Sequence, residues 1–129
     1  MRRILFGAVA MLVAASAAYA HHSYAATYDV TREITIDGKI VQFVYRNPHS
    51  FVHVTTKGEN GESERWAVEW SGTTQLGNAG VTRETLKIGD PVVIQARPSR
   101  VAGEYRALML KLKRTTDGFT WGSPGQQVD

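Results

Sequence analysis

The chain has 129 residues, 43% of them hydrophobic, with 15 basic and 12 acidic side chains and no cysteine. Most of this length fits into one domain with a single hydrophobic core. The lack of cysteine excludes disulfides, thioether attachment of haem and thiolate metal sites, so any bound metal would need nitrogen or oxygen ligands.

Residues 1–20 have the pattern of a secretory signal peptide. Arg2 and Arg3 form a short basic start, an apolar run follows, and Ala18-Tyr19-Ala20 matches a signal-peptidase site. The apolar run is shorter than the roughly 20 residues of a membrane-spanning helix. Cleavage after residue 20 therefore predicts a periplasmic or secreted protein without a transmembrane segment. Loss of the two arginines takes the basic residues from 15 to 13, against 12 acidic ones, and this near balance predicts no nucleic-acid partner.

The mature chain is expected to begin with an N-terminal arm, residues 21–31, and to continue into a long strand. Residues 32–45 are rich in β-branched and aromatic side chains, with Asp37-Gly38 in the middle. The apolar positions change from even to odd numbers after Gly38, which a β-bulge in one bent strand would produce. Asp-Gly is also a common tight turn, and a hairpin at this point would give a six-stranded sandwich. We favour the single bent strand.

A corner and a hairpin follow the long strand. Pro48 has no N–H and disfavours helical angles at Asn47, which predicts a turn at residues 47–49. Residues 51–57 and 62–70 read as two strands, and a three-residue loop with Gly61 in the left-handed region would join them. In this register the facing pairs are Val52 with Val68 and Val54 with Trp66 on the core face, and Phe51 with Glu69 and His53 with Ala67 on the outer face.

The remaining elements are a short helix and two strands. Residues 71–80 predict a helix that is capped by Ser71, Thr73 or Thr74 and ended by Gly80. Strands are expected over residues 92–97 and 105–113, and the polar, glycine-rich residues 114–129 predict a flexible C-terminal tail. This order of elements predicts an all-β fold with one short helix, a five-stranded OB-like barrel over residues 32–113. Its expected core residues are Ile34, Ile36, Ile40, Val52, Val54, Trp66, Val68, Ile94, Leu108 and Leu110, and the last strand is expected to carry Leu108, Leu110 and Leu112 on one face.

Several motifs occur together along the mature chain. They are His21-His22-Ser23-Tyr24-Ala25-Ala26, Asn47-Pro48-His49 before Val52-His53-Val54, Trp66-Ala67-Val68-Glu69, the glycine-ended helix, and Leu86-Lys87-Ile88-Gly89-Asp90. Together they resemble a family of small exported bacterial proteins that is catalogued as domain of unknown function 6152. The resemblance spans nearly the whole mature chain. It implies the location and the fold type, and it implies no activity.

Four histidines, His21, His22, His49 and His53, are the candidate metal ligands. Cleavage before His21 would leave its α-amino group free beside its imidazole, and these two nitrogens can chelate one ion. Copper(II) prefers such nitrogen ligands and needs no thiolate, and an α-amine with a pKa near 7.7–8.0 can lose its proton to a competing metal at neutral pH. His49 and His53 lie about 13 Å apart in an extended strand, so one of them is expected to complete a copper site with His21. The simpler interpretation is that the terminal histidines are only exposed.

Metal-free binding is the alternative function. The outer face around Phe51, His53 and Glu69 predicts a surface for a protein, a saccharide or a small anionic ligand, whose identity stays open. Three arginines near the last hairpin, Arg106 among them, could hold an anion, although arginines near a loop are often ordinary surface. The sequence has no Gly-x-Ser-x-Gly elbow and no complete catalytic set. We therefore predict a binding protein rather than an enzyme.

Overall fold

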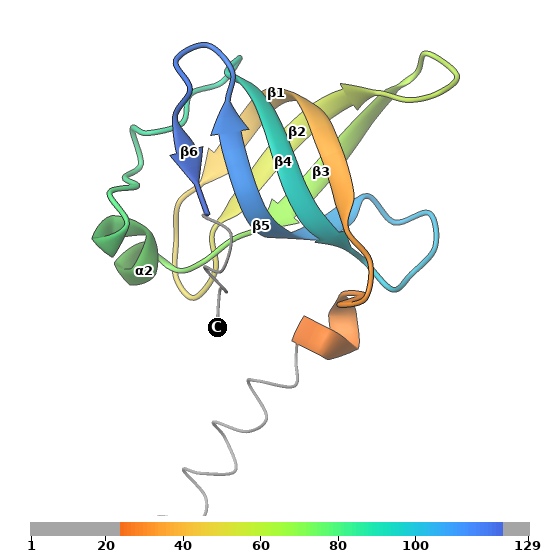
Figure 1. Ribbon diagram of the computed structural model, residues 1–129, viewed down its shortest axis with the longest axis horizontal. Coiled ribbons are helices and arrows are strands. Elements are labelled where there is room, and N and C mark those ends of the chain that lie inside the picture. Colours follow the sequence, from red (N-terminus) through yellow and green to blue (C-terminus); the bar gives the residue numbers. More distant parts are fainter. Residues whose placement is uncertain (1–23, 123–129) are drawn as a thin grey trace, which may run out of the picture.

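The computed structural model describes residues 24–122, which form six strands and a short helix after a helical turn at residues 24–27 (Figure 1). The predicted signal peptide and two of the candidate metal ligands, His21 and His22, lie outside the described residues. Within them, no helix has the length and apolar character to cross a membrane. The elements are β1 (Ile34–Val44), β2 (Phe51–Lys57), β3 (Ser63–Glu69), α2 (Thr73–Asn78), β4 (Pro91–Pro98), β5 (Arg106–Arg114) and β6 (Thr120–Trp121).

Five of the strands close into a barrel. The sheet order is β3-β2-β1-β4-β5-β6, and neighbours in this order run antiparallel. A short parallel pairing between β3 and β5 joins the two sides of the sheet, while β6 adds to β5 outside this closure. The predicted five-stranded OB-like barrel is therefore confirmed. The closing pairs are Ala67 with Arg106, Val68 with Ala107 and Glu69 with Leu108.

β1 is one long strand, as the favoured interpretation predicted. Its first part pairs with β4 and its second part with β2, so the strand must bend. At Gly38 a Cβ atom would lie 2.3 Å from the carbonyl oxygen of Thr55, so only glycine allows β1 and β2 to come this close. The bulge itself is at Val41, because Ile40 and Gln42 pair with consecutive residues of β2. The parity switch was thus predicted three residues too early, and the six-stranded sandwich is wrong.

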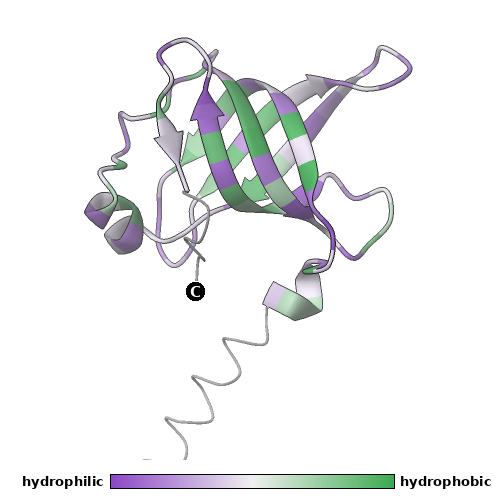
Figure 2. Cartoon of the chain, in the orientation of Figure 1, coloured by the Kyte–Doolittle hydropathy of each residue, from purple (hydrophilic) through white to green (hydrophobic). Residues whose placement is uncertain are grey.

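The β2–β3 hairpin has the predicted register. Gly61 has a φ of 81°, and the amide of Gly58 donates to the carbonyl of Glu62 at 2.7 Å, which closes the turn. Figure 2 shows bands of apolar and polar residues along the front strands of the barrel, β1, β4 and β5. All four predicted facing pairs are present: Val52 with Val68, Val54 with Trp66, Phe51 with Glu69, and His53 with Ala67.

The core lies inside the barrel and differs from the predicted one mainly along β5. The two residues that flank Leu110 pair with consecutive residues of β4, so β5 bulges at Leu110. Before the bulge Ala107 and Met109 face the core, and after it Leu112 does. The expectation that Leu108, Leu110 and Leu112 share one face is therefore wrong. Of the ten predicted core residues, Ile36, Ile40, Val52, Val54, Val68 and Ile94 belong to the core, Ile34 and Trp66 pack partly buried against it, Leu108 is buried outside it, and Leu110 is only partly buried.

The short helix α2 lies beside the barrel (Figure 1) and places Leu76 in the core. Its N-cap is Gly72, which has no side chain to offer, so the predicted cap by Ser71, Thr73 or Thr74 is wrong. Instead, the side-chain oxygen of Asn47 accepts bonds of 2.9 Å from both the amide and the hydroxyl of Thr73. A Cβ atom at residue 72 would lie 2.7 Å from the carbonyl oxygen of Pro48, which explains the glycine. The predicted turn at residues 47–49 therefore also caps the helix. The helix is followed by Gly80 at a φ of 79°, near the predicted end.

The C-terminal segment is more ordered than the sequence predicts. β6 pairs with Leu112 and Lys113 of β5, and the ring of Trp121 lies 5.0 Å from that of the buried Trp70. A Cβ atom at Gly122 would lie 2.4 Å from a β5 carbonyl oxygen, so the chain passes close to the sheet. Residues 115–122 are therefore packed on the barrel and are not a loose tail. The rest of the predicted tail, residues 123–129, lies outside the described residues.

Candidate functional site

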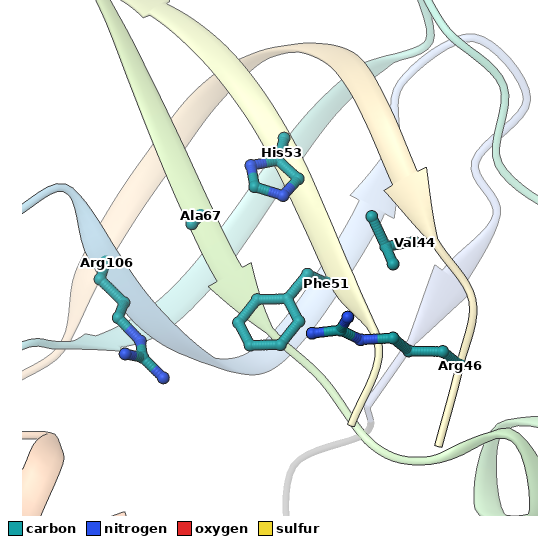
Figure 3. Close-up of a pocket in the computed structure, with 6 residues that line it drawn as sticks. All are labelled: Val44, Arg46, Phe51, His53, Ala67 and Arg106. Atoms are coloured by element: carbon teal, nitrogen blue, oxygen red, sulfur yellow. The ribbon is translucent and has the colours of Figure 1, made fainter. Parts of the chain in front are cut away.

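The outer face of β1, β2 and β3 carries a hollow of about 360 Å³. Because successive side chains of a strand point to opposite faces, Val52 and Val54 of β2 fill the core, while Phe51 and His53 point outward. Ala67 opposite His53 is small, which leaves room above the sheet. The lining residues, which Figure 3 shows, are Val44, Arg46, Phe51, His53, Ala67 and Arg106.

Two arginines flank the aromatic ring at the centre of the hollow. The guanidinium carbon of Arg46 lies 5.5 Å from the ring centroid of Phe51, and that of Arg106 lies 5.9 Å from it. Figure 3 shows Phe51 between the two side chains, which come from the β1–β2 corner and from the start of β5. Within the described residues, the only side-chain hydrogen bond of Arg46 runs from Nε to the carbonyl of His49 at 3.4 Å. Its terminal nitrogens are therefore available to an anionic ligand.

His53 contributes a neutral imidazole near pH 7. Its ring stacks on Phe51 at a centroid distance of 6.5 Å. Burial, followed by the charge of Arg65, lowers the pKa of His53 below its usual 6.5. Arg65 is oriented by a 2.9 Å bond to the side-chain oxygen of Gln42. An anion that enters the hollow would favour protonation of His53, because its negative charge would attract the imidazolium and oppose the charge of Arg65.

A buried carboxylate lies beside the hollow. Glu69 at the end of β3 is 5% exposed, and it accepts hydrogen bonds from the hydroxyl of Tyr28, from Nδ1 of His49 at 2.6 Å and from a terminal nitrogen of Arg106 at 3.1 Å. The Nε of Arg106 also donates to the Tyr28 hydroxyl at 2.9 Å. A buried charge needs such partners. Glu69 therefore joins the β1–β2 corner, β3, β5 and the N-terminal segment (residues 24–29) at one point.

Two tyrosines one helical turn apart attach the N-terminal segment to Glu69, Tyr28 directly and Tyr24 through His49. The hydroxyl of Tyr24 bonds to Nε2 of His49 at 3.0 Å, and the two rings stack at 5.4 Å. Tyr28 is 1% exposed. Burial, and the charge of Glu69, raise the pKa of both tyrosines. Both phenols therefore stay protonated, and the Tyr24–His49–Glu69 chain of hydrogen bonds is suited to holding the segment and not to nucleophilic attack.

The predicted site residues divide into two groups. Phe51 and His53 line the hollow, as predicted for the binding face. Glu69 lies on the same face but binds His49, and not His53 as its diagonal neighbour in the hairpin. Both ring nitrogens of His49 have partners, and no three His, Cys, Asp or Glu side chains between residues 24 and 122 are grouped to hold a metal. The predicted copper site depends on His21, outside the described residues, and stays a prediction.

Sequence reasoning missed most of the residues that surround Phe51 and Glu69. The hairpin register already placed Ala67 opposite His53, so the open space above it could have been inferred. Arg46 lies two residues beyond the end of β1, so its position beside the same face could also have been inferred. Arg106 was predicted only as one of three arginines that could hold an anion. The positions of Arg106 and Tyr28 could not be inferred, because they depend on the parallel β3–β5 pairing and on packing of the N-terminal segment.

Comparison with known proteins gives a family and a structural similarity. No curated protein matches the chain. Among solved structures, the mitochondrial single-stranded DNA binding protein Rim1 from S. cerevisiae is similar, with 13% sequence identity and a TM-score of 0.49 over 67% of this chain and 96% of that one. The model of a family of unknown function, DUF6152, matches residues 9–107. This match covers most of the barrel and agrees with the resemblance seen in the sequence motifs, and the chain belongs to the DUF6152 family.

Proposed function

We propose that this protein is an exported binding module that holds a small ligand with an anionic group and an apolar body in the hollow of β1, β2 and β3. The observation that carries this proposal is the pair of arginines, Arg46 and Arg106, on either side of Phe51. Export rests on the signal-peptide pattern of residues 1–20. The hollow belongs to the face that the sequence singles out around Phe51 and His53.

The lining chemistry favours an organic anion over a saccharide. Phe51, Val44 and Ala67 offer apolar surface, and the only charged groups in the lining are the two guanidinium groups. Arginine binds carboxylates and phosphates through paired N–H groups. The volume of about 360 Å³ is at the small end of the range of ligand pockets. A ligand with one ring and one or two acidic groups combines these properties.

Benzoate is a suitable probe, because it joins one aromatic ring to one carboxylate. We expect benzoate to shift the backbone amide resonances of Phe51, His53 and Ala67 in NMR titrations, and we expect benzyl alcohol and sulfate to bind more weakly. Arg46→Gln should weaken benzoate binding about tenfold, since a charge-assisted hydrogen bond contributes about 1.5–3 kcal/mol. Arg83→Gln is the matched control.

The control is close because Arg83 stacks on Tyr45 at 5.6 Å, much as Arg46 stacks on Phe51, but it does not line the hollow. Equal binding of benzoate and benzyl alcohol would show that the anionic group is not recognised. Equal losses in the Arg46 and Arg83 variants would show that binding occurs elsewhere. Either result would overturn the proposed function.

A further inference from the structure

Arg106 is the one lining residue of the hollow that also contacts the N-terminal segment, within the described part of the chain. Its guanidinium carbon lies 5.9 Å from the ring centroid of Phe51 and 5.7 Å from that of Tyr28. Its Nε donates to the Tyr28 hydroxyl at 2.9 Å, and a terminal nitrogen donates to Glu69 at 3.1 Å. These bonds leave further N–H groups of the guanidinium for a ligand. One side chain thus connects the segment to the hollow.

The partners of Arg106 are themselves held from outside the hollow. Glu69 is fixed by His49 as well as by Tyr28 and Arg106. A long arginine side chain loses up to about 2 kcal/mol of rotamer freedom when it is ordered. Because Tyr28 and Glu69 already hold the Arg106 side chain in place, a ligand that contacts Arg106 does not have to order it. The ligand therefore binds more tightly.

The segment also makes backbone contacts that do not involve Arg106. The amide of Asp29 donates to the carbonyl of Pro98 at 2.9 Å, and the amide of Arg100 donates to the carbonyl of Thr27 at 3.0 Å. These contacts fix the segment to the loop between β4 and β5, with Tyr28 and Ser99 in an isolated β-bridge. Exchange of the two amides therefore reports whether the segment is docked.

We infer that docking of the N-terminal segment, residues 24–29, and ligand binding in the hollow strengthen each other through Arg106, with Tyr28 and Glu69 as positioning residues. This inference rests on the proposed anion-binding function. The coupling is reciprocal by thermodynamic necessity. A ligand that binds Arg106 stabilises the docked segment, and undocking of the segment lowers the affinity for the ligand. The segment is thereby part of the binding site although it does not line the hollow.

The test compares Tyr28→Phe with Tyr24→Phe, which removes a hydroxyl from the same segment. Among residues 24–122, the Tyr24 hydroxyl bonds only to His49, so its removal leaves the contacts of Arg106 intact. We expect Tyr28→Phe to weaken benzoate binding about fivefold or more, and Tyr24→Phe to weaken it clearly less. Thermal unfolding followed by circular dichroism checks that both variants are folded. We expect them to fold, because each substitution keeps the aromatic ring and removes only the hydroxyl.

Hydrogen exchange gives a readout that a purely structural role of Tyr28 would not change. Saturating benzoate should slow exchange of the Asp29 and Arg100 amides in the unchanged protein, and this effect should be lost in folded Tyr28→Phe. Equal affinities of the two tyrosine variants, or no effect of benzoate on the two amides, would overturn the coupling while the hollow still binds. If benzoate does not bind the unchanged protein, both the proposed function and this coupling fail.

Discussion

Replacement of the buried carboxylate, Glu69→Gln, should destabilise the protein strongly. The amide keeps the size of the side chain but removes its charge and puts a donor where an acceptor is needed. Tyr28, His49 and Arg106 all donate to this carboxylate, and hydrogen bonds to a charged group contribute about 1.5–3 kcal/mol each. The His49 and Arg106 side chains are 37% and 39% exposed, and water screens their share. We expect the free energy of unfolding to fall by about 2–4 kcal/mol, a large part of the about 5–15 kcal/mol that stabilises a domain.

The assay is urea unfolding at pH 7, followed by tryptophan fluorescence, with the slope against urea compared between variants. Glu64→Gln is the control, because Glu64 lies on the same strand and, in the part of the chain that the structure describes, accepts a side-chain hydrogen bond only from the exposed Tyr105, at 3.0 Å. We expect this variant to change the midpoint little. If the two variants lose the same free energy, or if Glu69→Gln loses none, the carboxylate does not hold the barrel and the N-terminal segment together.

Three further predictions address the fold, the hollow and the metal hypothesis. Met109→Ala should lower the free energy of unfolding by about 2–5 kcal/mol, and Leu110→Ala should lower it less, as measured by urea unfolding. The reverse order would contradict the bulge in β5. The pKa of His53 is lower in the folded than in the unfolded protein, so the unfolded state binds more protons. The free energy of unfolding should therefore decrease as the pH falls through 6.5, and His53→Gln should show a smaller decrease; identical pH profiles would exclude this role. One residue added before His21 should weaken copper(II) binding about tenfold or more in calorimetry, and unchanged affinity would exclude the α-amine as a ligand.

Local sequence patterns were sufficient to predict the barrel and its central hairpin. Alternation along residues 51–57 and 62–70, with Gly61 at the turn, allows only one register that buries the valines together, because a shift of one residue would mix the faces. The same alternation placed Phe51 and His53 on the outer face, where the hollow lies. These patterns involve residues close together in the sequence, so they can be interpreted without knowledge of the rest of the chain.

The positions of the bulges in the long strands and the surroundings of Glu69 could not be predicted, because they depend on contacts across the whole fold. Leu108, Met109 and Leu110 are all apolar, so their pattern does not tell which of them faces the core; the pairing with β4 does. Arg106 reaches the hollow because β5 closes the barrel against β3 in parallel, and Tyr28 reaches Glu69 from 41 residues away. Contacts between segments so distant in sequence produce no periodic pattern of residues in either segment. They depend on how the barrel closes and not on the neighbouring residues in the sequence.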